Sequence, residues 1–166
     1  MSIAPTVAAP HGNFLRKGRS SVPGQIYLVT SVTKDRRKWF LDFDLGCLAS
    51  KILNSPQLWP DANLLAWVLM PDHLHLLVEL GDRESLELAV QRVKSLVSKE
   101  LRLSLGPAQI WQPGFHDHAL RNSEDVISVA RYVIANPIRA GLAKDVGEYP
   151  FWGSAWIDPQ ADPLDW

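Results

Sequence analysis

The sequence predicts an α+β domain in which helices cover a central antiparallel sheet. Short segments rich in β-branched and large apolar residues alternate with longer segments that have apolar residues at helical spacing. Two of the strand-like segments are separated by only two residues, which is typical of an antiparallel hairpin. With 166 residues, of which 46% are hydrophobic, the chain is long enough to bury one core, and we expect a single domain.

The first half of the chain predicts a strand, a helix and a hairpin. Residues 25–33 are rich in β-branched residues and lie between a Pro-Gly pair and a charged cluster, which indicates a strand. Residues 42–55 have apolar residues at helical spacing and stop before a proline, which indicates a helix. Residues 62–70 and 73–80 flank a Pro-Asp pair that suits a tight turn, so we expect them to form a hairpin.

The second half predicts two more helices with a short strand between them. Residues 84–105 indicate a long helix that ends at a Gly-Pro pair. Its expected buried stripe consists of Leu86, Val90, Val93, Val97 and Leu101. Residues 115–120 predict a short strand, and a last helix is expected from Asn122 or Ser123 to about Asn136. The resulting order, β-α-β-β-α-β-α, is the split βαβ arrangement of ferredoxin-like folds, with helices on one face of the sheet.

The two ends of the chain lack the patterns of a packed domain. We expect residues 1–13 to form a flexible N-terminal tail, residues 14–155 the domain, and residues 156–166 an acidic C-terminal tail. The sequence shows no targeting signal and no apolar run of membrane-spanning length. Its single cysteine, Cys47, forms no internal disulfide and lies in an apolar run, so we expect it in the core of a cytoplasmic protein.

Charge is distributed unevenly, although the formal net charge is only −1. Basic residues gather between positions 15 and 38, where they are Arg16, Lys17, Arg19, Lys34, Arg36, Arg37 and Lys38. Acidic residues predominate beyond position 141. The net charge alone argues against a nucleic-acid partner, but the basic cluster is a candidate phosphate-binding surface.

Two histidines lie one residue apart inside the expected hairpin. Alternate side chains of a strand share a face, so His73 and His75 point together, and a tight turn pairs them with Met70 and Val68. The apolar residues expected on the opposite face are Leu65, Trp67, Leu69, Leu74, Leu76, Val78 and Leu80. From spacing alone, two interpretations stay open. The imidazoles are either satisfied by hydrogen bonds or form a metal-binding pair, which requires a third ligand from elsewhere.

The expected last helix offers two further polar residues. Tyr132 and Asn136 are four positions apart and so lie on one helix face, beside the apolar stripe. An Asn carbonyl is a hard ligand for Mg²⁺ or Mn²⁺, and a phenol is a nucleophile once its proton is accepted. The alternative is that Tyr132 is a half-buried aromatic residue and Asn136 a helix-end residue.

Three segments, PDHLHLLVE, IWQPGFHDHALRN and YVIANPIRAGL, resemble in order and spacing the REP-associated tyrosine transposases. These are the single-tyrosine branch of the HUH (His-hydrophobic-His) endonucleases and belong among the IS200-like transposases. The resemblance covers roughly residues 15–155. It implies that His73 and His75 bind the metal, that Asn136 completes the site and that Tyr132 is the nucleophile. It also implies a ferredoxin-like fold with a C-terminal catalytic helix.

The same resemblance implies a metal-dependent single-strand DNA endonuclease or strand transferase that acts on REP-like hairpins through a 5′-phosphotyrosine intermediate. Its expected cofactor is Mg²⁺ or Mn²⁺, and its expected partner is single-stranded or hairpin DNA, without a membrane, in the bacterial cytosol or nucleoid. A homodimer and a monomer both stay open. Two alternatives are a hairpin-binding protein of the same fold that does not cleave and a metal-dependent nuclease in which water attacks.

Cations of the basic cluster and of the long helix are expected to follow the DNA backbone. The predicted DNA contacts are Arg16, Lys17, Arg19, Ser20, Lys34, Arg36, Arg37, Arg92, Lys99 and Arg102, each with a solvated charge as the alternative. Two positions depart from the family pattern. Asp72 stands where the family commonly has Asn before the first histidine, and Gly114 stands where a basic residue usually follows WQP.

Overall fold

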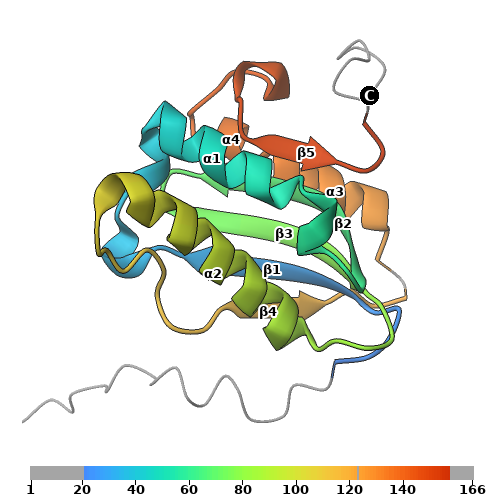
Figure 1. Cartoon of the computed structure of the whole chain (residues 1–166). Helices are drawn as coiled ribbons and strands as arrows, with labels where there is room; N and C mark the ends of the chain where they lie inside the picture. Colours follow the sequence, from blue (N-terminus) through green and yellow to red (C-terminus); the bar gives the residue numbers. More distant parts are fainter. Residues whose placement is uncertain (1–20, 123, 158–166) are drawn as a thin grey trace, which may run out of the picture.

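The structure is a computed structural model that describes residues 21–122 and 124–157. Its strands are Ile26–Val32 (β1), Ala62–Met70 (β2), His73–Leu80 (β3), His116–Ala119 (β4) and Trp152–Ser154 (β5). Its α-helices are Phe43–Leu53 (α1), Leu86–Leu105 (α2), Val126–Ile134 (α3) and Asn136–Arg139 (α4). All strand pairs are antiparallel, in the order β4-β1-β3-β2-β5. α1 and α2 cover one face of this sheet, and α3 and α4 lie on the other (Figure 1).

This topology confirms the predicted split βαβ fold. The four strands expected from the sequence form the block β4-β1-β3-β2, and β5 is an addition that pairs with the edge of β2. β5 is only three residues long, so it offers no alternation by which the sequence would indicate a strand. The expected tail at 1–13 and most of the one at 156–166 lie outside the described residues. No helix within the described ranges is long and apolar enough to cross a membrane.

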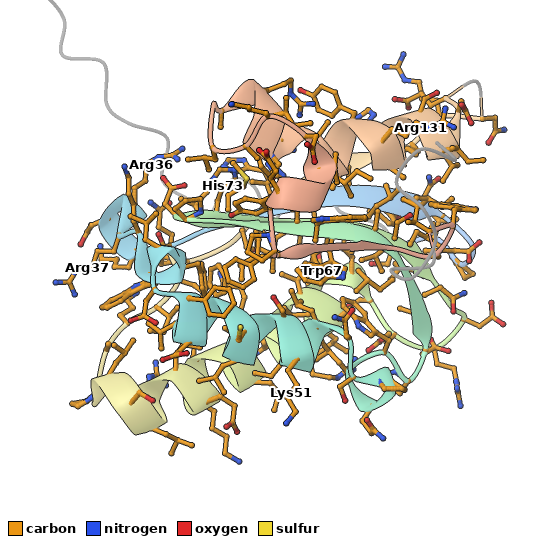
Figure 2. All side chains as sticks on the ribbon, turned by 90° about the horizontal axis from the view of Figure 1, so that it is seen from above. Arg36, Arg37, Lys51, Trp67, His73 and Arg131 are labelled. Atoms are coloured by element: carbon orange, nitrogen blue, oxygen red, sulfur yellow. The ribbon has the colours of Figure 1, made fainter. Side chains whose placement is uncertain are left out.

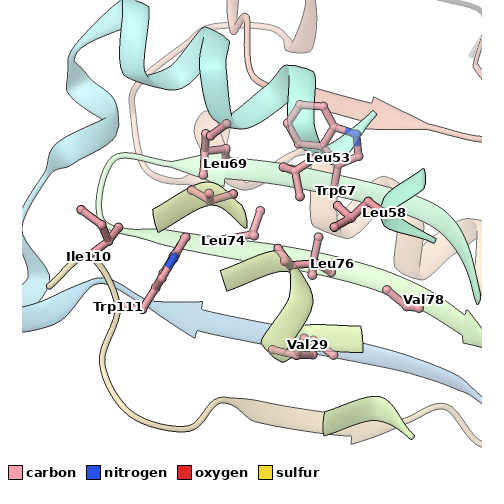
Figure 3. Packing of buried hydrophobic residues seen from close by; sticks show 14 of the residues in the cluster. Val29, Leu53, Leu58, Trp67, Leu69, Leu74, Leu76, Val78, Ile110 and Trp111 are labelled. Carbon is pink, nitrogen blue, oxygen red and sulfur yellow. The ribbon is translucent and has the colours of Figure 1, made fainter. Parts of the chain in front are cut away.

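The main core lies between the sheet and the pair α1 and α2, as Figure 3 shows. The predicted stripe of α2 is buried throughout, and so are Trp67, Leu69, Leu74, Leu76, Val78 and Leu80 of the hairpin. α1 is capped by the Asp42 carboxylate, which accepts from the Asp44 and Leu45 amides. The prediction that Cys47 lies in the core is wrong. The face of α1 that carries Leu45 and Ala49 is buried in the core, and Cys47, which lies between them in sequence, is on the exposed face.

The predicted face of Leu65 is also wrong, because β2 contains an irregularity. Leu64 pairs with Val78, but Ala66 pairs with Leu77, so two steps along β2 match one step along β3. Such a β-bulge moves the extra residue out of the alternation. Leu65 packs against the apolar cluster of Ala66 and Leu77 on the opposite face. Trp67 and Leu69, beyond the bulge, keep the predicted face.

The last predicted helix begins later than expected and is broken in two. Asp125, rather than Asn122 or Ser123, caps α3, because its carboxylate accepts from two amides of the first turn. α3 ends at Ile134, and Asn136 opens the short α4. Pro137 was expected to stop the helix, but it occupies the first turn of α4, where a missing N–H costs nothing. Asn136 therefore does not follow Tyr132 along one continuous helix.

Gly46 of α1 lies against the ring of Phe151, and a Cβ built at this position would overlap that ring. We expect Gly46→Ala to lower the free energy of unfolding by about 1–3 kcal/mol through overpacking, which outweighs the gain of about 1 kcal/mol in helix propensity. Chemical denaturation measures the change. Adding Phe151→Leu to the Gly46→Ala variant should recover part of the loss, and a Gly46→Ala protein as stable as wild type would contradict the close packing.

Candidate metal and nucleophile site

His73 and His75 lie side by side at the start of β3. Their rings are in edge-to-face contact, with centroids 4.8 Å apart. β3 pairs them with Met70 and Val68 of β2, as the tight turn predicted. In Figure 2, His73 lies on the side of the sheet that faces the C-terminal helices, and Trp67 lies on the other side. The alternation of the hairpin therefore places both imidazoles on the face that α3 covers.

Each imidazole uses one ring nitrogen within the fold. His75 Nδ1 is 2.8 Å from the Thr30 hydroxyl on β1, and His73 Nδ1 is 2.6 Å from the Asp72 carboxylate. Among the described residues, neither Nε2 atom has a hydrogen-bond partner. A second hydrogen bond at the far nitrogen is what fixes the orientation and tautomer of metal-binding histidines. Each ring is thus held in place through Nδ1, and its Nε2 is available to coordinate a metal ion.

The electrostatic surroundings keep His75 neutral. Burial, the neighbouring His73 and the positive charge of Arg139 lower the pKa of His75 from its ordinary value of 6.5 to about 4. At neutral pH the ring therefore carries a lone pair rather than a second proton, which is the form that binds a metal ion.

This shift predicts how the stability of the metal-free protein depends on pH. The unfolded chain takes up a proton on His75 below about pH 6.5, and the folded chain resists protonation down to about pH 4. The stabilisation is therefore present above pH 6.5 and is lost as the pH falls toward 4. We expect a loss of about 2 kcal/mol from this ring, after allowing for its partial contact with solvent. Urea denaturation across this pH range measures it, with His75→Gln as the control that should show a shallower slope.

The carboxyl group of Asp72 is the second charge at the site. Burial raises its pKa, but the hydrogen bond and charge of His73, joined by Arg36, bring the pKa below its ordinary value. Asp72 is therefore ionised at neutral pH and accepts a hydrogen bond from the ring of His73. The sequence marked this position only as a departure from the family pattern and gave no sign that its side chain would reach two partners.

Tyr132 lies on α3 with 59% of its surface exposed. The guanidinium of Arg139, from α4, stacks on its ring at 3.7 Å from the centroid. The charge of the same arginine acts on His75. Arg139 therefore connects the predicted nucleophile electrostatically with the histidine pair. The predicted site did not include Arg139, and because a break separates α3 from α4, helical spacing along the sequence does not account for its contact with Tyr132.

The helix that carries Tyr132 packs on the sheet face of the two histidines, although Tyr132 forms no hydrogen bond with either imidazole in the described part of the chain. Val133, the residue after Tyr132, packs on Val68 and Met70, which are the cross-strand partners of the two histidines. Within residues 21–122 and 124–157, neither Tyr132 nor Asn136 hydrogen-bonds to either imidazole.

The side chain of Asn136 is oriented by a hydrogen bond to the backbone of α3. Its Nδ2 donates to the carbonyl of Val133 at 2.8 Å, and its Oδ1 has no hydrogen-bond partner in the described part of the chain. The carbonyl end of the amide is thus left for another donor or for a cation. Its role as a metal ligand stays a prediction.

The donors present fit a divalent ion held partly by non-protein groups. The two imidazoles would supply two nitrogen ligands, and the described residues contain no cluster of three His, Cys, Asp or Glu side chains that could hold a metal. Remaining positions would be filled by an amide oxygen, water or phosphate oxygens. Mixed nitrogen and oxygen donors suit Mn²⁺ better than Mg²⁺, because Mg²⁺ prefers oxygen throughout.

The predicted DNA contacts fall into three groups. Arg16, Lys17, Arg19 and Ser20 lie outside the described residues. Lys34, Arg36 and Arg37 lie in the turn after β1, and Arg36 reaches Asp72 at 3.2 Å, so this group adjoins the histidines. Figure 2 shows Arg36 and Arg37 at the same end of the sheet as His73.

The third group, on α2, lies across the sheet from the histidine face (Figure 1). Arg92 pairs with Glu84 and donates to the carbonyl of Leu58, and Arg102 donates to the carbonyl of Ala108. Lys99 is exposed. The guanidinium of Arg92 is thus engaged in joining α2 to neighbouring turns, and a DNA contact at these three positions stays a prediction.

Comparison with known proteins gives consistent matches. Residues 21–136 match the model of the IS200-like transposases. The chain is 28% identical over 133 residues to a REP-associated tyrosine transposase of Escherichia coli, covering 80% of this chain and 78% of the relative. It is 26% identical over 161 residues to a putative REP-associated tyrosine transposase of Haemophilus influenzae, covering 89% and 90%.

A solved structure gives the corresponding match in three dimensions. It is that of a REP-associated tyrosine transposase bound to a REP hairpin, with a TM-score of 0.62 and 25% identity over 81% of this chain and 79% of the other. These matches confirm the resemblance and the fold that the sequence predicted. Because the matched residues 21–136 span most of the chain and include both histidines, Tyr132 and Asn136, the chain belongs to the IS200-like transposase family of enzymes.

Proposed function

We propose that this protein is a metal-dependent single-strand DNA endonuclease and strand transferase that acts on REP-like hairpin DNA through a 5′-phosphotyrosine intermediate. One observation carries the proposal: the rings of His73 and His75 lie side by side on the sheet face on which the helix of Tyr132 packs, and neither Nε2 has a partner among the described residues. The relatives named REP-associated tyrosine transposases, one of them solved with a REP hairpin, support hairpin DNA as the substrate.

His73, His75 and the Oδ1 atom of Asn136 would hold the ion. A bound Mg²⁺ or Mn²⁺ would neutralise charge on the scissile phosphate and orient it. The fold supplies rigidity for this task, because Thr30 and Asp72 fix the two rings at Nδ1. Lys34, Arg36 and Arg37 lie at the same end of the sheet and would bind neighbouring phosphates.

Tyr132 would attack the phosphorus of the scissile phosphate. The bond between its oxygen and phosphorus forms as the bond to the 3′-oxygen breaks. The phenol gives its proton to solvent, and the departing 3′-oxygen takes up a proton to become a hydroxyl. The 5′ end of the downstream strand stays on Tyr132, so the phosphodiester energy is kept for rejoining to another 3′-hydroxyl. The exposure of Tyr132 makes its hydroxyl accessible to DNA.

A direct test uses the full chain with a REP-like hairpin flanked by single strands and labelled at its 3′ end. With Mn²⁺ we expect a labelled protein band that survives denaturation, because the 5′-phosphate fragment carries the label. EDTA should abolish the band. Hairpin binding without cleavage would favour a non-cleaving DNA-binding protein, and cleavage without a protein-linked label would favour attack by water. Either result would refute the proposed intermediate.

A further inference from the structure

Asp72 lies at the turn of the hairpin and uses both of its carboxylate oxygens. Oδ1 is 2.6 Å from Nδ1 of His73, and Oδ2 accepts from the guanidinium of Arg36 at 3.2 Å. The Asp72 side chain is 19% exposed, whereas that of Arg36 is 65% exposed. One half-buried carboxylate thus joins a predicted metal ligand to a cation at the surface.

The backbone around this carboxylate is held firmly. Thr33, which is fully buried, donates its amide to the carbonyl of Asp72 at 2.9 Å. Its hydroxyl lies between two carbonyls, that of Asp72 at 2.9 Å and that of Arg37 at 2.7 Å. The turn that follows contains two consecutive non-glycine residues with positive φ, 54° at Asp35 and 51° at Arg36. This left-handed backbone is unfavourable for such residues and persists where the surroundings impose it. It brings Arg36 back toward the hairpin turn, where Asp72 receives it.

We propose that Asp72 is a positioning residue that ties the metal-binding His73 and the phosphate-binding Arg36 into one unit. The inference rests on the proposed function for the roles of those two partners. A carboxylate that accepts from Nδ1 fixes the ring with its Nε2 lone pair outward and makes that nitrogen a better donor to a metal ion. Only one N–H of Arg36 is used by Asp72, so its remaining donors are available to a DNA phosphate beside the metal site.

The carboxylate is essential to this double contact. An amide at position 72 would present one oxygen and one nitrogen. Its oxygen can accept from the ring of His73, but its nitrogen cannot accept from Arg36. The aspartate of this chain therefore adds a link between the basic turn and the histidine pair, and it adds a negative charge that strengthens both hydrogen bonds.

Calorimetric titration of the metal-free protein with Mn²⁺ tests the contact to His73 without any DNA. We expect Asp72→Asn to weaken Mn²⁺ binding about tenfold, and Asp72→Ala to weaken it up to about a hundredfold. Asp35→Asn is the matched control. It removes the same charge from the neighbouring turn, where the carboxylate pairs with Lys34, and should leave the Mn²⁺ affinity unchanged. Equal affinity of the wild-type and Asp72→Asn proteins would overturn the inference, as would a wild-type protein that binds no Mn²⁺.

Hairpin DNA binding in EDTA tests the contact to Arg36. Arg36→Gln should weaken binding severalfold in the wild-type background but much less in the Asp72→Ala background, where the guanidinium is no longer held. The Mn²⁺ affinity of Arg36→Gln should stay within about twofold of wild type, because His73 keeps its carboxylate. Equal losses of DNA binding in the two backgrounds would show that Asp72 does not position Arg36.

The ring of His73 in the unmutated protein gives a test that does not depend on any variant folding. Two-bond ¹H–¹⁵N spectra of the metal-free protein should show the proton on Nδ1, and a proton on Nε2 would overturn the inference. A failure of the positioning role of Asp72 is distinguishable from a failure of the proposed function. A protein with the expected Mn²⁺ affinities that forms no DNA adduct would refute the proposed function alone, whereas adduct formation with unchanged Mn²⁺ affinity in Asp72→Asn would refute the positioning role alone.

Discussion

Tyr132→Phe is expected to abolish the covalent adduct with DNA and to leave hairpin binding intact. The substitution removes only the phenol oxygen, which is the proposed nucleophile, so the rate of strand cleavage should fall on the order of 10³-fold or more. The ring on which Arg139 stacks remains, and the hydroxyl has no hydrogen-bond partner among the residues that the structure describes. Single-turnover assays with 3′-labelled hairpin measure the adduct, and thermal unfolding should show an unchanged midpoint.

Tyr149→Phe is the matched control. The hydroxyl of Tyr149 donates to the carbonyl of Leu69 at 2.6 Å in the interior, and burial raises the pKa of this phenol to about 12. Loss of this hydrogen bond should lower the free energy of unfolding by about 1 kcal/mol. The amount of covalent adduct should not change. An adduct that persists in Tyr132→Phe would show that another nucleophile acts.

Mixing two inactive proteins tells whether the tyrosine serves its own chain. Tyr132→Phe protein keeps the histidines, and His75→Ala protein keeps the tyrosine. If Tyr132 acts in its own subunit, the mixture should stay inactive. Recovery of the adduct on mixing would show that the tyrosine helix of one copy serves the histidines of another, which requires a dimer.

The double substitution His73→Ala and His75→Ala is expected to remove Mn²⁺ binding and, with it, the Mn²⁺-dependent adduct. The pair supplies both nitrogen donors of the candidate site, and no cluster of three His, Cys, Asp or Glu side chains in the described part of the chain offers a substitute. Calorimetry with Mn²⁺ and the adduct assay measure the two losses separately. Hairpin binding in EDTA should persist, because the basic turn is unchanged.

A second His-x-His pair provides the control. His116 and His118 lie on the edge strand β4, where both are exposed and His118 pairs with Glu124. Thr30 of β1 pairs with His116 on one side and with His75 on the other, so the control pair lies on the same sheet face. Replacing His116 and His118 by Ala should leave Mn²⁺ affinity and adduct formation unchanged. Loss of Mn²⁺ binding in this control, but not in the variant of His73 and His75, would relocate the metal site.

Local patterns were sufficient for most of the scaffold. The alternation of the hairpin predicted which side chains share a face, and the helical spacing of α2 predicted its buried stripe, because both depend on backbone geometry that repeats every few residues. Three departures occurred where a single residue interrupts the repeat. They are the bulge at Leu65, the carboxylate cap at Asp125 and the restart of the helix before Pro137.

The amino-acid sequence by itself determined the hairpin, the shared face of the two histidines and the family, because alternation, spacing and motifs are all local properties. Only the tertiary structure decided what surrounds the histidines. The contacts of Asp72 with Arg36 and of Arg139 with Tyr132 join side chains from separate elements. Such contacts depend on how turns and helices pack, and packing is set by the sum of many weak interactions across the fold rather than by any repeat in the chain.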